Sequence, residues 1–472
     1  MSRASGDARP DERLSQLAAG RVAALKAPAS FLAVADAQGG LRCGSSGDSG
    51  GGTEPALDTQ FRIASCTKSF TAARILQLRD AGLLDLDAPI TSLLQGPLNL
   101  LLPDEFSTTP TPRMLLTMSA GFATDNEWAD RQESLGQSAL DALLAGGVRF
   151  IAEPGTQYEY SNLGYAILGR IAEEICGQPF TTQVEQFVLK PLGLDSIRFA
   201  VDPTRDTAVG FSYQAETWVD QPLTGPGAFS PIGGLFASAA ELIRWGQWLA
   251  DAFAPGASDE VLSASSRREM QTSWVQRPSP DLVIGYGFGV FVEQDPALGT
   301  VVSHSGGYPG FSSHMRWRID SGTVAVGFEN GTYAGVFEPV RAVLLDAEGA
   351  DATASAGLQN RSKRGKAGAP WPETQRAVDL VTDLIGAWSD ERADEVFTSN
   401  VAADLPYALR RSNIEHVVAE IGRPFRIEDV EYPTAAAANW RVRGSGGVLN
   451  VAITLHPLHP PRVQSLELST GD

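Results

Sequence analysis

The spacing of apolar residues in the first part of the chain predicts a helix, a strand and then a second, deeply buried helix. Residues 11–26 are amphipathic with a helical period, and residues 31–40 alternate before a Gly-Gly turn, which is a hairpin signal. The helix that starts at Ser65 has few charged residues before Arg79, so we expect it to be buried on nearly every side. Gly82 stands where a C-cap glycine would end that helix. A side chain at the start of this helix should therefore be held rigidly.

The middle of the chain changes from helical to strand periodicity. Residues 84–260 alternate helical segments with long loops rich in glycine and proline, which predicts a helical lobe. Strand-like runs follow at 286–293, 299–304, 313–319 and 323–328, and a helix near 334–346 closes the unit. Strands from both ends of this region, with helices inserted between them, predict an α+β fold in which an antiparallel sheet is flanked by helices.

A change in composition separates this region from the C-terminus. Residues 350–369 are rich in Ala, Gly, Ser and basic residues, as linkers are, and the basic cluster 361–366 is interpreted as solvated linker. Beyond it, a helical repeat, a second helix near 412–421 and four strand-like runs predict a small α+β domain. We therefore expect a domain over 1–349, a linker over 350–369 and a second domain over 370–472, whose function no motif reveals.

Composition and charge exclude several classes of function. The 472 residues exceed what one hydrophobic core usually organises, and a hydrophobic content of 43% is ordinary for a globular protein. The net charge of -19 argues against nucleic acid or an anionic membrane surface as a partner, because both attract positive charge. Three scattered cysteines fit neither a disulfide framework nor a cysteine-based zinc site. Since no leader-like or membrane-spanning stretch is evident either, we expect a cytoplasmic protein.

Ser65 and Lys68 form a Ser-x-x-Lys pair at the start of the buried helix. Residues three apart share one face of a helix, so the lysine amine can reach the serine oxygen, and the N–H groups of the helix start can meet developing negative charge. A serine can be made nucleophilic in this way without a Ser-His-Asp triad. The pair alone is also compatible with an N-cap serine beside a surface lysine. The adjacent Cys66 points about 100° away around the helix and is interpreted as buried packing.

Two further motifs favour a catalytic role for Ser65 and Lys68. Tyr160-Ser-Asn162 lies in a Pro-Gly loop that leads into a helix, and His304-Ser-Gly-Gly307 follows a predicted strand. With these three motifs in this order, the chain resembles the serine β-lactamase and penicillin-binding protein superfamily, specifically its class C-like branch of esterases, D-aminopeptidases and related hydrolases. That branch shows Ser-x-x-Lys, then Tyr-x-Asn, then His-Ser-Gly in place of Lys-Thr-Gly.

The segments between the motifs match that superfamily as well. Residues 111–122 look like its helix-to-loop segment before the tyrosine, and residues 231–242 look like its glycine-rich turn, so the resemblance covers roughly residues 10–348. It implies a β-lactamase/transpeptidase-like fold and a small ester, amide or peptide as the substrate. No cofactor and no metal are expected.

The resemblance implies that Ser65 is the acylated nucleophile and Lys68 its activating partner. Tyr160 would carry a proton to the leaving group and help to activate the acceptor in deacylation. A tyrosine with a pKa near 10 is a poor base at neutral pH, and a neighbouring cation such as Lys68 would lower that cost. Which of Lys68 and Tyr160 takes the first proton stays open at this point.

The same resemblance implies roles for the residues around this pair. Asn162 would hydrogen-bond the amide or the acyl side chain of the substrate, and His304 would support the tyrosine without taking the first proton. The N–H groups of Ser65 and Gly307 would form the oxyanion hole. Ser305 and Gly306 would contact the substrate as substrate-binding residues.

Two other patterns imitate functional sites and are rejected. The run 47–51, Gly-Asp-Ser-Gly-Gly, copies the trypsin-like serine signature, but that mechanism needs a histidine earlier in the chain and all five histidines follow it. Residues 44–52 are interpreted as a flexible hairpin loop. His456 and His459 have a metal-like spacing, but proline interrupts it and no third ligand is evident.

The sequence therefore predicts a serine hydrolase that acts through an acyl-enzyme on small esters or amides, with D-aminoacyl compounds and β-lactams within its range. His304 in place of the usual lysine favours esters or D-configured amides over antibiotics. An acyl transferase or peptide cyclase on the same scaffold is the alternative among enzymes, and a binding or sensor protein is the alternative outside them. The presence of Ser65, Lys68 and Tyr160 speaks against the last. The second domain would shape substrate access or assembly, and the oligomeric state stays open.

Overall fold

The computed structural model describes residues 8–279, 282–350 and 369–471. Its largest feature is a nine-stranded sheet in the order β1-β3-β2-β15-β14-β13-β12-β11-β10, in which β1 pairs parallel to β3 and the other neighbours are antiparallel. The strands are β1 (Arg9–Pro10), β2 (Ala29–Ala35), β3 (Leu41–Gly47), β10 (Val275–Arg277), β11 (Val283–Tyr286), β12 (Phe291–Asp295), β13 (Gly299–Tyr308), β14 (Phe311–Arg318) and β15 (Val324–Glu329). The α+β fold expected from the sequence is confirmed.

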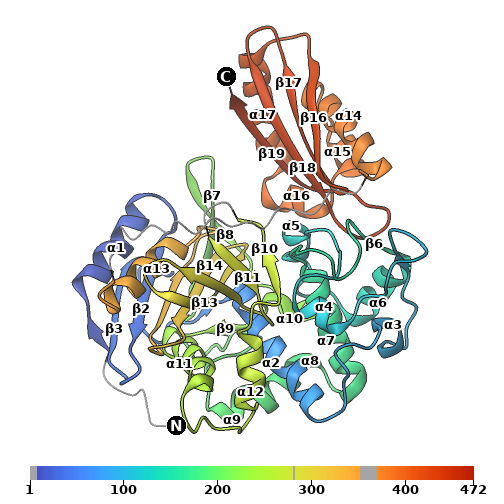
Figure 1. Cartoon of the computed structure of the whole chain (residues 1–472). Coiled ribbons are helices and arrows are strands. Elements are labelled where there is room, and N and C mark those ends of the chain that lie inside the picture. The colour runs from blue at the N-terminus through green and yellow to red at the C-terminus, as the bar shows by residue number, and fades with distance from the viewer. Residues whose placement is uncertain (1–7, 280–281, 351–368, 472) are drawn as a thin grey trace.

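Helices cover both faces of this sheet because its central strands are apolar on both sides. In β2, Phe31 and Ala33 pack into one core, whereas Leu32 and Val34 pack into the other. The smaller core is closed by α1 (Glu12–Ala23) and α13 (Phe337–Ala347), and the larger one by α2 (Thr67–Asp80) and α11 (Ala239–Ala250) (Figure 1). The first buried helix expected from the sequence is therefore a core helix.

The remaining helices of the first 350 residues form the expected helical lobe beside the sheet (Figure 1). They are α3 (Ile90–Leu93), α4 (Pro112–Leu116), α5 (Asn126–Ala129), α6 (Gln137–Gly146), α7 (Asn162–Cys176), α8 (Phe180–Val184), α9 (Lys190–Leu192), α10 (Ser230–Gly233) and α12 (Ala264–Met270). Within the described residues, three two-stranded sheets complete the lobe and its edges: β4 (Phe61–Arg62) with β9 (Phe236–Ala237), β5 (Leu100–Leu101) with β6 (Val148–Arg149), and the hairpin of β7 (Gly210–Gln214) with β8 (Thr217–Gln221). Phe211 of β7 also forms an isolated bridge with Gly331.

The expected strand over 286–293 is wrong, because a turn divides this run into β11 and β12. Gly289 in the turn has φ +75, and a Cβ at this position would lie 2.5 Å from the carbonyl oxygen of Lys68. The turn therefore packs directly on the start of α2, which only a glycine allows. Two glycines spaced by one residue fit the alternation of a strand as well as a turn, so the pattern could not separate the two.

The C-terminal part is a small domain with its own sheet and its own core (Figure 1). The sequence predicted two helices before the sheet, and the structure has four: α14 (Pro372–Gly386), α15 (Asp390–Val396), α16 (Ser399–Asp404) and α17 (Tyr407–Ile421). The expected four-strand meander is formed by β16 (Arg426–Thr434), β17 (Ala437–Arg443), β18 (Val448–Leu455) and β19 (Val463–Gly471). Helices α15 and α16 were missed because six or seven residues are too few to establish a helical period.

This domain packs against the helical lobe through specific polar contacts. The indole of Trp371 donates to the carbonyl of Phe150 at 3.2 Å, and Arg149 forms an ion pair with Glu373 at 2.6 Å. Most of the expected linker, residues 351–368, lies outside the described residues, so the domain boundaries at 349 and 370 stay predictions. In the described part of the chain, no helix combines the length and the apolar character needed to cross a membrane.

Candidate active site

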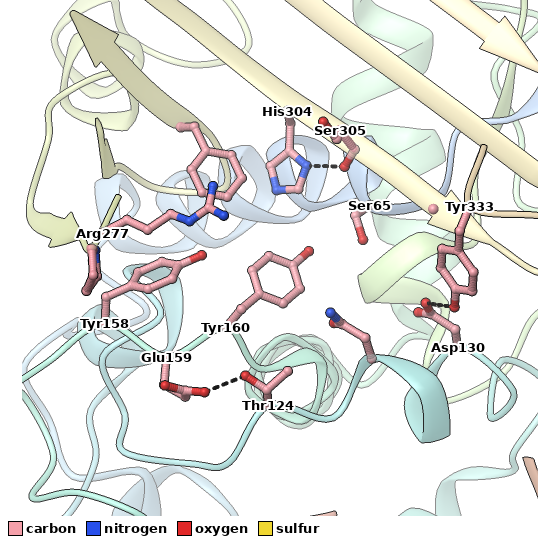
Figure 2. Close-up of a pocket in the computed structure, with 14 residues that line it drawn as sticks. Ser65, Thr124, Asp130, Tyr158, Glu159, Tyr160, Arg277, His304, Ser305 and Tyr333 are labelled. Atoms are coloured by element: carbon pink, nitrogen blue, oxygen red, sulfur yellow. Dashed lines mark hydrogen bonds between the residues drawn. The ribbon is translucent and has the colours of Figure 1, made fainter. Parts of the chain in front are cut away.

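A cavity of about 510 Å³ lies between the sheet and the helical lobe, and most of the residues singled out in the sequence meet there (Figure 2). Its wall is contributed by the start of α2, by the loop before α7, by α5 and by strands β10, β12 and β13. The lining residues are Ser65, Thr124, Asn126, Asp130, Tyr158, Glu159, Tyr160, Arg277, Pro278, Phe291, His304, Ser305, Gly307 and Tyr333.

Ser65 and Lys68 form a hydrogen-bonded pair at this cavity. Ser65 lies in a 3-10 turn, Ala64–Cys66, that runs directly into α2, so the expected α-helix begins two residues later than predicted. The Nζ of Lys68 donates to the Oγ of Ser65 at 2.9 Å and to the carbonyl oxygen of Ile232 at 2.8 Å. Lys68 is fully buried, and this burial lowers the pKa of its amine to about 7. A large fraction of this amine is thus neutral at physiological pH.

Tyr160 stands beside this pair in the loop that leads into α7. Its ring centre lies 5.1 Å from the Nζ of Lys68, and its hydroxyl points toward Ser65 (Figure 2). Burial raises the pKa of the Tyr160 phenol well above its ordinary value, and the neighbouring Ser65 hydroxyl opposes this only in part. The sequence argument that the lysine would favour a phenolate is therefore outweighed by desolvation. Of the two groups whose order was left open, Lys68 has the pKa of a base that works near neutrality.

His304 is a neutral, buried histidine whose two ring nitrogens both have partners. Its Nδ1 lies 2.6 Å from the carbonyl oxygen of Ser305, to which it donates, so its Nε2 accepts from the hydroxyl of Tyr286 at 3.0 Å. Burial, together with the charge of Lys68, lowers the pKa of His304 to about 3. The ring centre lies 6.3 Å from that of Tyr160. His304 therefore lies near Tyr160 as an uncharged ring whose orientation is fixed by its two hydrogen bonds.

The backbone of β13 offers an open edge next to Ser65. Strand β12 pairs with β13 only as far as Ser303, and from there β13 borders the cavity. Tyr308 and Phe311 flank a two-residue turn, so they form a hydrogen-bonded pair of the hairpin. Such pairs alternate with non-hydrogen-bonded ones, so the next pair, Gly307 with Ser312, is not hydrogen-bonded. The N–H of Gly307 therefore points away from β14. A Cβ on Gly307 would lie 2.4 Å from the ring of Tyr333. The N–H of Gly307 can thus reach a substrate oxygen at the cavity.

The second glycine of this motif and the neighbouring cysteine have packing roles. A Cβ on Gly306 would lie 2.3 Å from the carbonyl oxygen of Ile63, so the strand can approach the start of α2 only with a glycine there. Cys66 is fully buried, and its thiol contacts the carbonyl oxygen of His304 at 3.2 Å. Burial raises the pKa of this thiol to about 12. These contacts fit the sequence interpretation of Cys66 as packing.

Asn162 lies behind the cavity wall instead of in it. It is 1% exposed, and its Nδ2 donates to the Oδ1 of Asn126 at 2.9 Å. Asn126, the first residue of α5, lines the cavity in its place. The N–H groups of Asn162 and Leu163 are held by the carboxylate of Asp125 at 2.7 and 2.8 Å, which fixes the start of α7. The position expected for a substrate-binding amide is therefore occupied by a residue that the sequence reasoning did not name.

Asp130, Tyr333 and Arg277 are among the further polar residues of the cavity that were missed in the sequence. The hydroxyl of Tyr333 donates to Asp130 at 2.7 Å on one side, and Arg277 comes from the edge strand β10 on the other side (Figure 2). The signal for Asp130 was an acidic side chain directly after Trp-Ala at the end of α5, but acidic residues are common at such positions. Tyr333 and Arg277 follow no motif, and only the fold brings them to Ser65.

Comparison with known proteins identifies a related family over most of the chain. The model of the Beta-lactamase family matches residues 14–349. Penicillin-binding protein 4* of Bacillus subtilis is 28% identical over 55% of this chain and 58% of its own length. Penicillin-binding protein 4 of Amycolatopsis lactamdurans is 30% identical over 61% and 76%, and the esterase EstB of Burkholderia gladioli is 28% identical over 61% and 82%.

The whole chain, including the C-terminal domain, has a counterpart among solved structures. The octameric penicillin-binding protein homologue from Pyrococcus abyssi covers 97% of this chain and 99% of its own, with a TM-score of 0.63 and 17% sequence identity. At this identity the likeness concerns the fold. The fold is therefore shared with that protein over nearly the whole length of both chains.

Proposed function

Because this chain belongs to the Beta-lactamase family and is a serine hydrolase, we propose that it forms an acyl-enzyme on Ser65 and hydrolyses small esters or amides. The observation that carries the proposal is the 2.9 Å hydrogen bond from a fully buried lysine amine to the Oγ of Ser65. A lysine with a pKa near 7 is an effective base for a serine hydroxyl at neutral pH, and its own burial supplies that pKa.

In the acylation step, neutral Lys68 takes the proton of the Ser65 hydroxyl while Oγ attacks the carbonyl carbon of the substrate. The carbonyl oxygen then becomes an oxyanion, which the N–H groups of Ser65 and Gly307 stabilise. When the tetrahedral intermediate collapses, the bond to the leaving group breaks and Tyr160 supplies its proton. The phenol can do so because its raised pKa keeps it protonated, and the lysine beside it returns the proton.

Deacylation repeats these steps with water in place of Ser65. Water loses a proton to the Lys68–Tyr160 pair as its oxygen attacks the acyl carbon, and Ser65 leaves with the proton returned to its Oγ. The cavity of about 510 Å³ can hold a small acyl group and such a water. An added amine that reached the acyl-enzyme would give transfer instead of hydrolysis.

The environment of His304 supports esters and amides over β-lactams as substrates. A lysine at this position in related enzymes would present a positive charge to a β-lactam carboxylate, whereas His304 is neutral and has both nitrogens engaged. The relatives named as penicillin-binding proteins and as an esterase are compatible with either chemistry. We therefore propose carboxylic esters and amides as the main substrate class.

The proposal is tested by labelling and turnover with a matched pair of serine variants. Wild type should react with a fluorophosphonate probe and hydrolyse p-nitrophenyl acetate, and Ser65→Ala should lose both. Ser49→Ala is the control, because Ser49 sits in the trypsin-like run and binds the carbonyl of Thr53 at 2.9 Å, away from the cavity. Equal labelling of wild type and Ser65→Ala would overturn the proposal. Repeating the reaction with hydroxylamine separates a hydrolase from a transferase by the share of hydroxamate formed.

A further inference from the structure

Asp130 is a buried carboxylate in the wall of the cavity. It follows α5, is 5% exposed, and accepts a hydrogen bond from the Tyr333 hydroxyl at 2.7 Å through Oδ2. Figure 2 shows Asp130 and Tyr333 on one side of Ser65, and Tyr158 and Arg277 on the opposite side of the cavity. One end of the cavity therefore presents the Asp130 carboxylate, and the other presents the Arg277 guanidinium together with the Glu159 carboxylate.

Asp130 is held by no ion pair among the described residues, although the charge of the nearby Lys68 amine acts on its pKa. Within residues 8–279, 282–350 and 369–471, no lysine, arginine or histidine forms an ion pair with this carboxylate. The next residue, Arg131, turns to Asp404 at 2.8 Å instead. By contrast, the equally buried Glu133 is paired with Arg62 at 2.7 Å, and Glu329 with Arg21 at 2.7 Å. A buried carboxylate without such a partner costs free energy, and sites of this kind concentrate where a ligand supplies the missing charge.

We infer that Asp130 is a subsite for a positively charged amine on the acyl part of the substrate, so that the enzyme acts on aminoacyl esters or amides. This rests on the proposed acylation of Ser65. The acyl part is assigned to this end because Tyr160, which would protonate the leaving group, lies toward the opposite end in Figure 2. Gly307, whose N–H would bind the oxyanion, contacts Tyr333 and so adjoins the Asp130 end.

The electrostatics of the site agree with this assignment. Burial raises the pKa of Asp130 to about 7, and the nearby charge of Lys68 opposes that rise. An ammonium group in contact with the carboxylate would lower this pKa again and keep Asp130 ionised. The bond from Tyr333 fixes the carboxylate before substrate arrives, so little ordering is needed on binding.

The test compares two esters that differ only in the ammonium group. Hydrolysis of alanine benzyl ester, as both enantiomers, is measured beside propionic acid benzyl ester at pH 7, where most of the α-amino group of the alanine ester is protonated. For wild type, we expect kcat/KM for one alanine enantiomer to exceed that for the propionate ester at least tenfold. In Asp130→Asn this ratio should fall at least tenfold. Glu127→Gln, which removes a carboxylate from the adjoining helix α5 outside the cavity lining, should keep the wild-type ratio.

A measurement on the wild-type protein covers the case in which Asp130→Asn does not fold. Alaninol should inhibit hydrolysis of the propionate ester competitively, and 1,2-propanediol, which lacks the ammonium group, should inhibit at least tenfold more weakly. Equal inhibition by the two compounds, or an ester preference that persists in folded Asp130→Asn, would overturn the subsite. Loss of Ser65-dependent hydrolysis of the propionate ester would overturn the proposed function instead, so the two failures are distinct.

Discussion

Gln464 in strand β19 accepts a hydrogen bond from the backbone N–H of Trp128 in α5 at 3.2 Å. Its Nε2 also donates to the carbonyl oxygen of Thr124 at 2.7 Å, so one side chain of the C-terminal domain holds both ends of a short segment. That segment carries Thr124, Asn126 and Asp130 into the cavity wall. The shape of the cavity therefore depends on a residue more than 330 positions away in the sequence.

We predict that Gln464→Leu lowers kcat/KM of the folded protein in addition to lowering its free energy of unfolding. The substitution keeps the volume but leaves a buried N–H and a buried carbonyl without a partner, which costs about 1–3 kcal/mol. Because both groups belong to the segment that lines the cavity, we expect kcat/KM to fall about tenfold or more, mainly through a higher KM. Steady-state kinetics and urea denaturation of the full chain measure the two effects.

Thr382→Val is the matched control for this variant. Thr382 lies in the core of the same domain, where its hydroxyl accepts from the indole of Trp440 at 3.0 Å and donates to the carbonyl of Val378 at 2.7 Å. It has no contact with the cavity segment, so it should lose stability and keep its kinetics. If both variants lose activity in proportion to their loss of folded protein, Gln464 has a purely structural role.

The pH dependence of turnover should follow the neutral form of Lys68. Burial lowers the pKa of this amine to about 7, and the deprotonated amine is the base, so activity should rise as the pH increases through 7 and level off above it. Below the midpoint, kcat/KM should fall about tenfold per pH unit. The measurement uses p-nitrophenyl acetate, which has no charge that would titrate or bind Asp130.

Asp130 provides a control for the assignment of the rise in activity with pH to Lys68. Asp130 also has a pKa near 7, and its negative charge raises the pKa of Lys68. In Asp130→Asn the rise with pH should persist and move to lower pH, because the amine loses a stabilising charge. Disappearance of the rise would instead identify Asp130 as the titrating group and contradict the role given to Lys68.

The chemistry of this site could be predicted from sequence where the chain brings residues together locally. Ser65 and Lys68 meet because they are three residues apart on one helical turn, and Cys66 turns away for the same reason. The hydrophobic periods likewise gave the sheet and the core helices. Local spacing and alternation are sufficient for such predictions because they depend on few residues.

The parts that the sequence did not predict depend on contacts between distant segments. Tyr333 and Arg277 reach the cavity from a loop after β15 and from the edge strand β10, with no motif at either position. Asn162 fitted the motif, yet Asn126 stands between it and the cavity. The order of proton transfer was open for a similar reason, since the pKa of Lys68 is set by burial in the folded protein.

Cys66 should be inert toward thiol reagents in the native protein although it adjoins the nucleophile. It is fully buried, and burial raises the pKa of its thiol to about 12, so little thiolate forms at pH 8. Treatment with iodoacetamide, followed by peptide mass spectrometry, should leave Cys66 unmodified until the chain is unfolded. The half-buried Cys43 and Cys176 serve as internal comparisons. Native modification of Cys66 with a parallel loss of turnover would contradict this packing role.

Tyr160→Phe should separate formation of the acyl-enzyme from its productive turnover. If Lys68 takes the first proton, the variant should still react with a fluorophosphonate probe at Ser65, because that base and its 2.9 Å bond remain. Turnover of an amide, whose leaving group must be protonated, should fall by about 10²- to 10⁴-fold. Tyr165→Phe is the control, since it removes another buried hydroxyl, bonded to the carbonyl of Leu116 at 2.9 Å. Full amide turnover by Tyr160→Phe would exclude the phenol as the proton carrier, and loss of labelling would mean that it is needed to activate Ser65.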